Sequence, residues 1–196
     1  MRKQLTWRYK DENKVPILKD SFNNLLNYCF KEATLVTLSD MQFARKRASH
    51  FMTQLKGCHI ATIQTRRWFH MDFTTADYTS EPLQGFTIVY LYQASKNVKR
   101  IIKKHTDNLF LLTNTINGMY EISPHMLEDL CFFRENKLLL GTSSHNYHCT
   151  IYPESDDEVY IFKEILSAEE SIASFEVNDV DCTLDINLAD FVMGGH

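Results

Sequence analysis

The chain has 196 residues, of which 44% are hydrophobic, 12% aromatic and 23% charged, and this composition excludes fibrous, low-complexity and disordered proteins. We expect one domain over residues 1–196, because a chain of this length buries about 70% of its unfolded surface and needs no metal or disulfide to hold a core. The five cysteines form no CxxC motif, which is typical of free thiols in a reducing compartment.

The charge is divided between two halves that no linker separates. Residues 1–105 contain 18 cations and 8 carboxylates, a net charge of +10, whereas residues 106–196 contain 3 cations and 17 carboxylates, a net charge of −14. Either the halves neutralise each other within one fold, or each presents a charged surface to a partner of opposite sign. The charged N-terminus and the lack of an apolar run of about 20 residues predict a cytoplasmic protein without a membrane segment.

The N-terminal part is predicted to form one strand and two helices. The strand is expected over residues 4–9. Residues 20–33 place apolar side chains three and four positions apart, which predicts a helix with one buried face. A second helix is expected over residues 39–57, with Ser39 or Asp40 as its N-cap.

The middle of the chain is predicted to be mainly β-structure. Aromatic and β-branched residues dominate the segments 59–65, 66–75 and 86–93. Residues 94–105 are expected to form a short helix. Asn117-Gly118 then indicates a hairpin turn.

In the last third, Ser123-Pro124 is expected to open a helical turn that precedes Glu128 and Asp129. Three further strands are predicted over residues 129–142, with a turn at Glu135-Asn136, and over residues 147–153. A helix with an acidic first turn follows at 154–168, and a last strand at 180–187. Because strands come in runs, we predict an α+β fold, with a mainly antiparallel sheet, two N-terminal helices and short helices packed on it.

The segment "GTSSHNYHC", residues 141–149, contains three side chains of metal-ligating type. On a strand, His148 and Cys149 point to opposite faces, and His145 lies about 13 Å from Cys149 along the backbone. One zinc ion cannot join them, so we predict no metal site and no cofactor. We expect Ser143, Ser144 and His145 in a polar turn at the rim of the sheet.

Strand alternation in "RRWFHMDF" collects a cation, a large aromatic side chain, an imidazole and a carboxylate on one face: Arg66, Trp68, His70 and Asp72. This face is either a half-exposed sheet surface or a binding surface, since tryptophan and arginine are favoured interface anchors. His145 would join it if the rim lies beside it. Asp72 could orient His70 for catalysis, but the sequence contains no nucleophile motif, so we assign no catalytic residue.

The helix at 94–105 places its cations on one face: Lys96, Lys99, Arg100, Lys103 and Lys104. This face is either solvated or able to follow a phosphate backbone. A second pattern, Asp129 followed by Glu135-Asn136-Lys137, loosely matches a metal-dependent nuclease core, although such short patterns often occur by chance.

The favoured function is a non-catalytic cytoplasmic interaction protein, a regulator or an inhibitor- or immunity-like binder of another macromolecule. Its acidic half would bind a basic partner through Glu154, Asp156, Asp157 and Glu158. One alternative is a nucleic-acid-binding protein that uses Lys99, Arg100 and Lys103 of the basic half. Another is a hydrolase-type enzyme that uses His70 and Asp72. A protein partner is preferred to nucleic acid, and no oligomeric state follows from the sequence.

Overall fold

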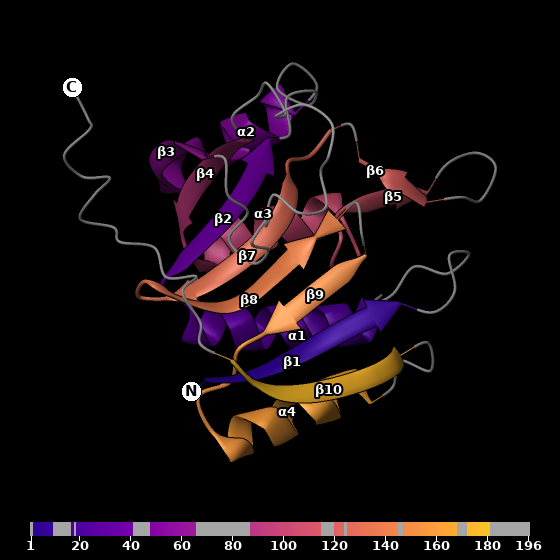
Figure 1. Cartoon of the computed structure of the whole chain (residues 1–196). Helices are drawn as coiled ribbons and strands as arrows, with labels where there is room; N and C mark the ends of the chain where they lie inside the picture. Colours follow the sequence, from indigo (N-terminus) through magenta and orange to yellow (C-terminus); the bar gives the residue numbers. More distant parts are fainter. Residues whose placement is uncertain are drawn as a thin grey trace, which may run out of the picture.

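The structure, a computed structural model, describes residues 2–9, 17, 19–40, 48–65, 87–114, 120–123, 125–144, 147–167 and 172–180. Eight of the described strands form one sheet in the order β10-β1-β9-β8-β7-β2-β4-β3, and every neighbouring pair in it is antiparallel (Figure 1). These strands are β1 (Arg2–Tyr9), β2 (Leu35–Asp40), β3 (His59–Thr65), β4 (Thr87–Gln93), β7 (Glu128–Arg134), β8 (Lys137–Ser143), β9 (His148–Ile151) and β10 (Ile172–Val180).

A separate hairpin and four α-helices complete the described elements. Strands β5 (Leu112–Asn114) and β6 (Tyr120–Ile122) pair with each other, on either side of the predicted Asn117-Gly118 turn. The helices are α1 (Lys19–Glu32), α2 (Ser49–Leu55), α3 (Lys96–His105) and α4 (Asp156–Leu166), and the short 3-10 helix η1 (Lys56–Cys58) follows α2. The predicted α+β class with an antiparallel sheet is therefore confirmed.

The sheet is buried on both faces in its centre. On one face, apolar side chains of the four helices pack on the strands, and Phe22, Phe51, Ile101 and Phe162 each contribute to this core. The opposite face carries a second buried cluster that includes Phe133 of β7. Strands buried on both faces lose the simple alternation of apolar and polar residues that identifies a half-exposed strand.

The predicted second helix over 39–57 is wrong in its first part. Ser39 and Asp40 are not an N-cap: they end β2, a central strand with six buried residues that pairs with β4 and β7. The helix that follows, α2, begins only at Ser49 and has Ala48 as its N-cap. The residues Ser39 and Asp40 suggest a helix N-terminus because a serine and an aspartate beside an apolar run are also typical of an N-cap.

One other local prediction is corrected at the same end of the sheet. Glu128 and Asp129 follow a turn in which the Met126 backbone N–H donates to the Ser123 carbonyl at 3.3 Å, and they begin β7, where Asp129 is almost fully buried. Ser143 and Ser144 are also buried rather than presented at a rim, with Ser143 inside β8. Asp129 Oδ1 accepts a hydrogen bond from the backbone N–H of Ser144 at 2.7 Å, which joins the two segments.

Several predicted elements are confirmed at closely similar bounds: β1, α1, β3, β4, α3, the β7–β8 hairpin turning at Glu135-Asn136, β9 and α4. Strand β10 was not predicted, and of the strand predicted at 180–187 only Val180 lies within the described residues. The predicted strand at 66–75 lies outside the described residues.

The basic and acidic halves are interleaved in the sheet. Strand β1 of the basic half lies between β9 and β10 of the acidic half, and β2 lies against β7 (Figure 1). An ion pair also joins a cation of the basic half, Lys3, to a carboxylate of the acidic half, Asp156. The charge division in the sequence is therefore partly neutralised in the fold.

Candidate functional site: an acidic cleft around Arg134

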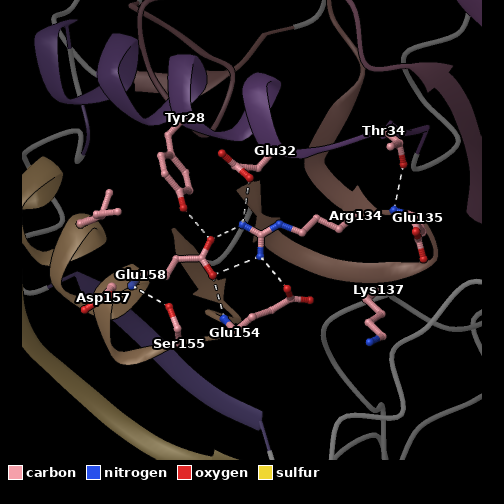
Figure 2. Close-up of a pocket in the computed structure, with 11 residues that line it drawn as sticks. Tyr28, Glu32, Thr34, Arg134, Glu135, Lys137, Glu154, Ser155, Asp157 and Glu158 are labelled. Carbon is pink, nitrogen blue, oxygen red and sulfur yellow. Dashed lines mark hydrogen bonds and ion pairs between the residues drawn. The ribbon is translucent and has the colours of Figure 1, made fainter.

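A cleft of about 740 Å³ opens where the C-terminal end of α1, the β7–β8 turn and the N-terminal end of α4 meet (Figure 2). The described residues of its lining include five carboxylates and two cations, a net charge of −3. The lining residues are Tyr28, Glu32, Thr34, Arg134, Glu135, Lys137, Glu154, Ser155, Asp157, Glu158 and Ile161. The cleft is thus assembled from three segments that are far apart in the sequence.

The start of α4 is determined by local sequence. Ser155 is the N-cap, and its Oγ accepts a hydrogen bond from the backbone N–H of Glu158 at 3.1 Å. Asp156, Asp157 and Glu158 occupy the first turn, where negative charge is stabilised by the positive end of the helix dipole. The Glu158 side chain turns back and accepts the backbone N–H of Glu154 at 2.7 Å, which fixes the chain entering the helix.

Arg134 lies at the centre of the cleft and is surrounded by carboxylates (Figure 2). Its guanidinium donates two hydrogen bonds to Glu158, one of them from Nη1 to Oε2 at 3.1 Å. Nη1 also lies 3.6 Å from Oε2 of Glu154. Such a bidentate arginine–carboxylate pair combines two charge-assisted hydrogen bonds with a fixed geometry.

Tyr28 completes the network from the α1 side. The Tyr28 hydroxyl donates to Glu158 Oε1 at 2.7 Å. The side chains of Arg134 and Glu158 are only 17% and 7% exposed, so the pair is partly desolvated. The Tyr28 ring packs edge-on against Phe162 of α4 with 4.9 Å between ring centroids. The network therefore fastens α1, β7 and α4 together.

The same contacts determine the protonation of the network. Burial alone would raise the pKa of Glu158, but hydrogen bonds from Arg134, from the Glu154 backbone and from Tyr28 outweigh it and lower the pKa. The hydrogen bond to Glu158 raises the pKa of Arg134, against the opposing effect of burial. Burial, followed by the hydrogen bond to Glu158, raises the pKa of Tyr28. Around neutral pH the pair is fully charged and Tyr28 is neutral.

The remaining carboxylates of the cleft face solvent. Glu135 and Asp157 are exposed, and the side chain of Glu154 is 48% exposed. Glu135 adopts a positive φ of 51° in the β7–β8 turn, where its backbone N–H donates to Thr34 Oγ1 at 2.8 Å. Glu154 pairs with Arg134, whereas Glu135 and Asp157 form no ion pair with a described cation.

The predicted site residues are distributed differently. Lys99, Arg100 and Lys103 lie on α3, far from the cleft lining in sequence and absent from it. The other predicted binding residues lie outside the described part of the chain: Arg66, Trp68, His70, Asp72 and His145. Among the acidic residues, Glu154, Asp157 and Glu158 line the cleft, whereas Asp156 pairs with Lys3.

The nuclease-like pattern is not brought together. Asp129 is buried at the start of β7, while Glu135 lies in the turn beyond the other end of that strand. Six extended residues separate them by about 20 Å. Within the described residues, no group of three or more histidine, cysteine, aspartate or glutamate side chains could hold a metal ion.

Sequence reasoning missed the central residue of the cleft. Arg134 is one of only three cations in residues 106–196, and a second, Lys137, also lines the cleft. A lone arginine in a strongly acidic region was therefore a usable signal, because an acidic surface tends to gather the few cations available to it.

Comparisons of the chain with protein-family models, curated proteins and solved structures find no significant match. None of the helices in the described part of the chain combines the length and apolar character needed to cross a bilayer.

Proposed function

We propose that the protein is a non-catalytic interaction protein that binds a basic segment of another macromolecule in the acidic cleft. The observation that carries the proposal is a cleft of about 740 Å³ whose described lining residues bear a net charge of −3. A concave surface of one charge sign attracts and orients a partner of the opposite sign. A cytoplasmic inhibitor or regulator of a basic protein is the role that this surface fits.

The chemistry of the cleft supports binding rather than proton transfer. A general acid or base works best when its pKa lies near the working pH. In this cleft the contacts lower the pKa of Glu158 and raise the pKa of Arg134, so both values move away from neutral pH. The cleft also already accommodates one guanidinium, that of Arg134, among three carboxylates, so it suits arginine side chains of a partner.

The test is titration with a six-residue oligoarginine peptide by calorimetry at low and high salt. We expect binding that weakens with salt, and a loss of affinity of about tenfold or more in the variant Glu135→Gln/Glu154→Gln/Asp157→Asn. Glu135 and Asp157 are exposed and form no ion pair in the described part of the chain, and Glu154 is exposed and contributes only a long pair of 3.6 Å with Arg134, so the variant should fold normally.

A matched control removes the same charge elsewhere. Asp20, Asp107 and Glu164 are exposed carboxylates outside the cleft, and Asp20→Asn/Asp107→Asn/Glu164→Gln should retain most of the affinity. Equal losses in the two variants would mean that the peptide senses only net charge, and the proposal would then be wrong. Absence of binding at low salt would also contradict it.

The basic face of α3 supports a second candidate, a nucleic-acid-binding protein. The helix carries no acidic residue, and its cations lie on the side opposite to the buried Val98, Ile101 and Ile102. In the described part of the chain these cations form no ion pair with a carboxylate: Lys99 instead donates to Asn27 Oδ1 at 2.8 Å and Arg100 to Asn97 Oδ1 at 2.8 Å. Cations without carboxylate partners are available to phosphates.

For this candidate we expect a generic single strand or duplex to bind in a strongly salt-dependent way. The variant Lys99→Ala/Arg100→Ala/Lys103→Ala should weaken binding by roughly tenfold or more at low salt and flatten the dependence of log affinity on log salt. Fluorescence anisotropy at two salt concentrations measures both quantities. No binding at low salt would eliminate the candidate.

A further inference from the structure

A second cavity, of about 280 Å³, lies between the C-terminal end of α2 and the edge of the sheet formed by β3 and β4. Among the described residues, it shares no lining residue with the acidic cleft. The described part of its wall is mostly aromatic and apolar, with one charged side chain. The lining residues are Met52, Thr53, Lys56, His59, Thr62, Tyr90 and Tyr92.

The register of the sheet brings the polar lining groups together. His59 is the cross-strand partner of Tyr92, and Thr62 that of Tyr90. The imidazole of His59 lies edge-on to Tyr92 with 5.7 Å between ring centroids, and its Nε2 is hydrogen-bonded to Thr62 Oγ1 at 2.9 Å. One wall is therefore a preformed set of aromatic rings.

The two tyrosines line the cavity with largely buried rings. Tyr92 is 2% exposed and Tyr90 is 7% exposed, and neither hydroxyl is among the fully buried side-chain oxygens of the described residues that lack a hydrogen-bond partner. A phenolic hydroxyl that lines a cavity can donate a hydrogen bond to an acceptor bound there. Burial, and then the neighbouring Tyr90, raise the pKa of Tyr92, so its hydroxyl remains a donor at neutral pH.

The positive charge of Lys56 in the lining favours a negatively charged ligand. Lys56 is exposed at the end of α2, and in the described part of the chain it forms no ion pair with a carboxylate. A cation and two phenolic donors suit a carboxylate, whereas the ring faces and Met52 suit a planar apolar group. A cavity of this size accepts about one ring with its substituents, because an apolar cavity of roughly 150 Å³ already holds benzene.

We propose that this cavity binds a small aromatic carboxylate, with its ring against Tyr90 and Tyr92 and its carboxylate near Lys56 and the two tyrosine hydroxyls. The proposal is independent of the function proposed for the acidic cleft. The two sites differ in lining and in the sign of their charge, so the failure of one leaves the other unaffected.

The test is an NMR titration with benzoate, benzyl alcohol, benzylamine and acetate. Benzoate is expected to bind with a Kd on the order of 1 mM, as befits so small a ligand, and to shift signals of α2, β3 and β4. Benzyl alcohol and benzylamine lack the negative charge, and acetate lacks the ring. Each should therefore bind at least about tenfold more weakly than benzoate. No binding at about 20 mM benzoate, or equal binding of benzyl alcohol or benzylamine, would overturn the proposal.

Variants give an independent criterion. Tyr92→Phe and Lys56→Gln should each weaken benzoate binding about tenfold, the loss expected for one hydrogen bond to a charged group. Tyr160→Phe, at an exposed tyrosine of α4, is the matched control and should have no effect. An unchanged Kd in Tyr92→Phe would contradict the proposal.

Discussion

Replacing Arg134 by glutamine is expected to lower the free energy of unfolding by about 3 kcal/mol at neutral pH, because breaking a buried ion pair leaves its partner charge uncompensated. The partner most affected is Glu158, whose side chain is 7% exposed. Glu32 and Glu154 lose their nearby cation as well. Equilibrium unfolding in urea measures the effect. The matched control is Arg100→Gln on α3, where the guanidinium donates only to Asn97 on the same exposed face, and little change is expected.

The difference between this variant and the natural protein should depend on pH with a defined sign. The pKa of Glu158 is lowered in the folded protein, so the stabilisation from its charged form is present above the unfolded value of about 4.3 and is lost as the pH falls through the folded value. In Arg134→Gln the cation that helps to lower the pKa of Glu158 is lost, so this pKa should be higher than in the natural protein. The stability difference should therefore be largest at neutral pH and shrink in acid. A difference that stays constant from neutral pH to about pH 3 would show that the charges are not its cause.

Replacing Phe162 by alanine is expected to cost about 3–4 kcal/mol, the usual loss for a fully buried phenylalanine. Phe162 is 0% exposed and packs edge-on against Tyr28, so it anchors α4 to α1. The matched control is Tyr160→Ala on the same helix, since Tyr160 is 67% exposed and should be almost neutral. Thermal unfolding of both variants measures the effect. A similar loss in the two variants would mean that helix formation, not packing, sets the cost.

The loss of Phe162 should also affect the cleft. Glu154, Asp157 and Glu158 are held at the start of the helix that Phe162 anchors. At a temperature where Phe162→Ala remains folded, the oligoarginine peptide should bind it more weakly than it binds Tyr160→Ala. Packing between α1 and α4 thus holds the carboxylates of the acidic cleft in position.

Elements with a strong local signal were predictable from the sequence. In α3, the apolar residues Val98, Ile101 and Ile102 recur at helical spacing, and in α4 a serine N-cap precedes three acidic residues. In contrast, β2 was missed because both of its faces are buried and because Ser39 and Asp40 imitate a helix start. Its identity as a strand depends on pairing with β4 and β7, which lie about 50 and 95 residues later in the chain.

The candidate site was predictable only in part for the same reason. The acidic first turn of α4 is a local feature, and Glu154, Asp157 and Glu158 were identified from it. The position of Arg134 beside them depends on the β7–β8 turn meeting α4, which no local pattern encodes. Three of the predicted binding residues, Lys99, Arg100 and Lys103, lie on the polar face of α3, outside the cleft lining.

The position of β1 has a consequence for how the chain folds during synthesis. This first strand pairs with β9 over three residues, Leu5, Thr6 and Trp7, and with β10 along nearly its whole length (Figure 1). Its main partner is therefore made about 170 residues after it. Until then the N-terminal strand leaves the ribosome with unpaired backbone groups, which makes it vulnerable to pairing with other chains. A chain interrupted before residue 172 would carry a first strand without its principal partner, and that edge would be open to pairing with other chains.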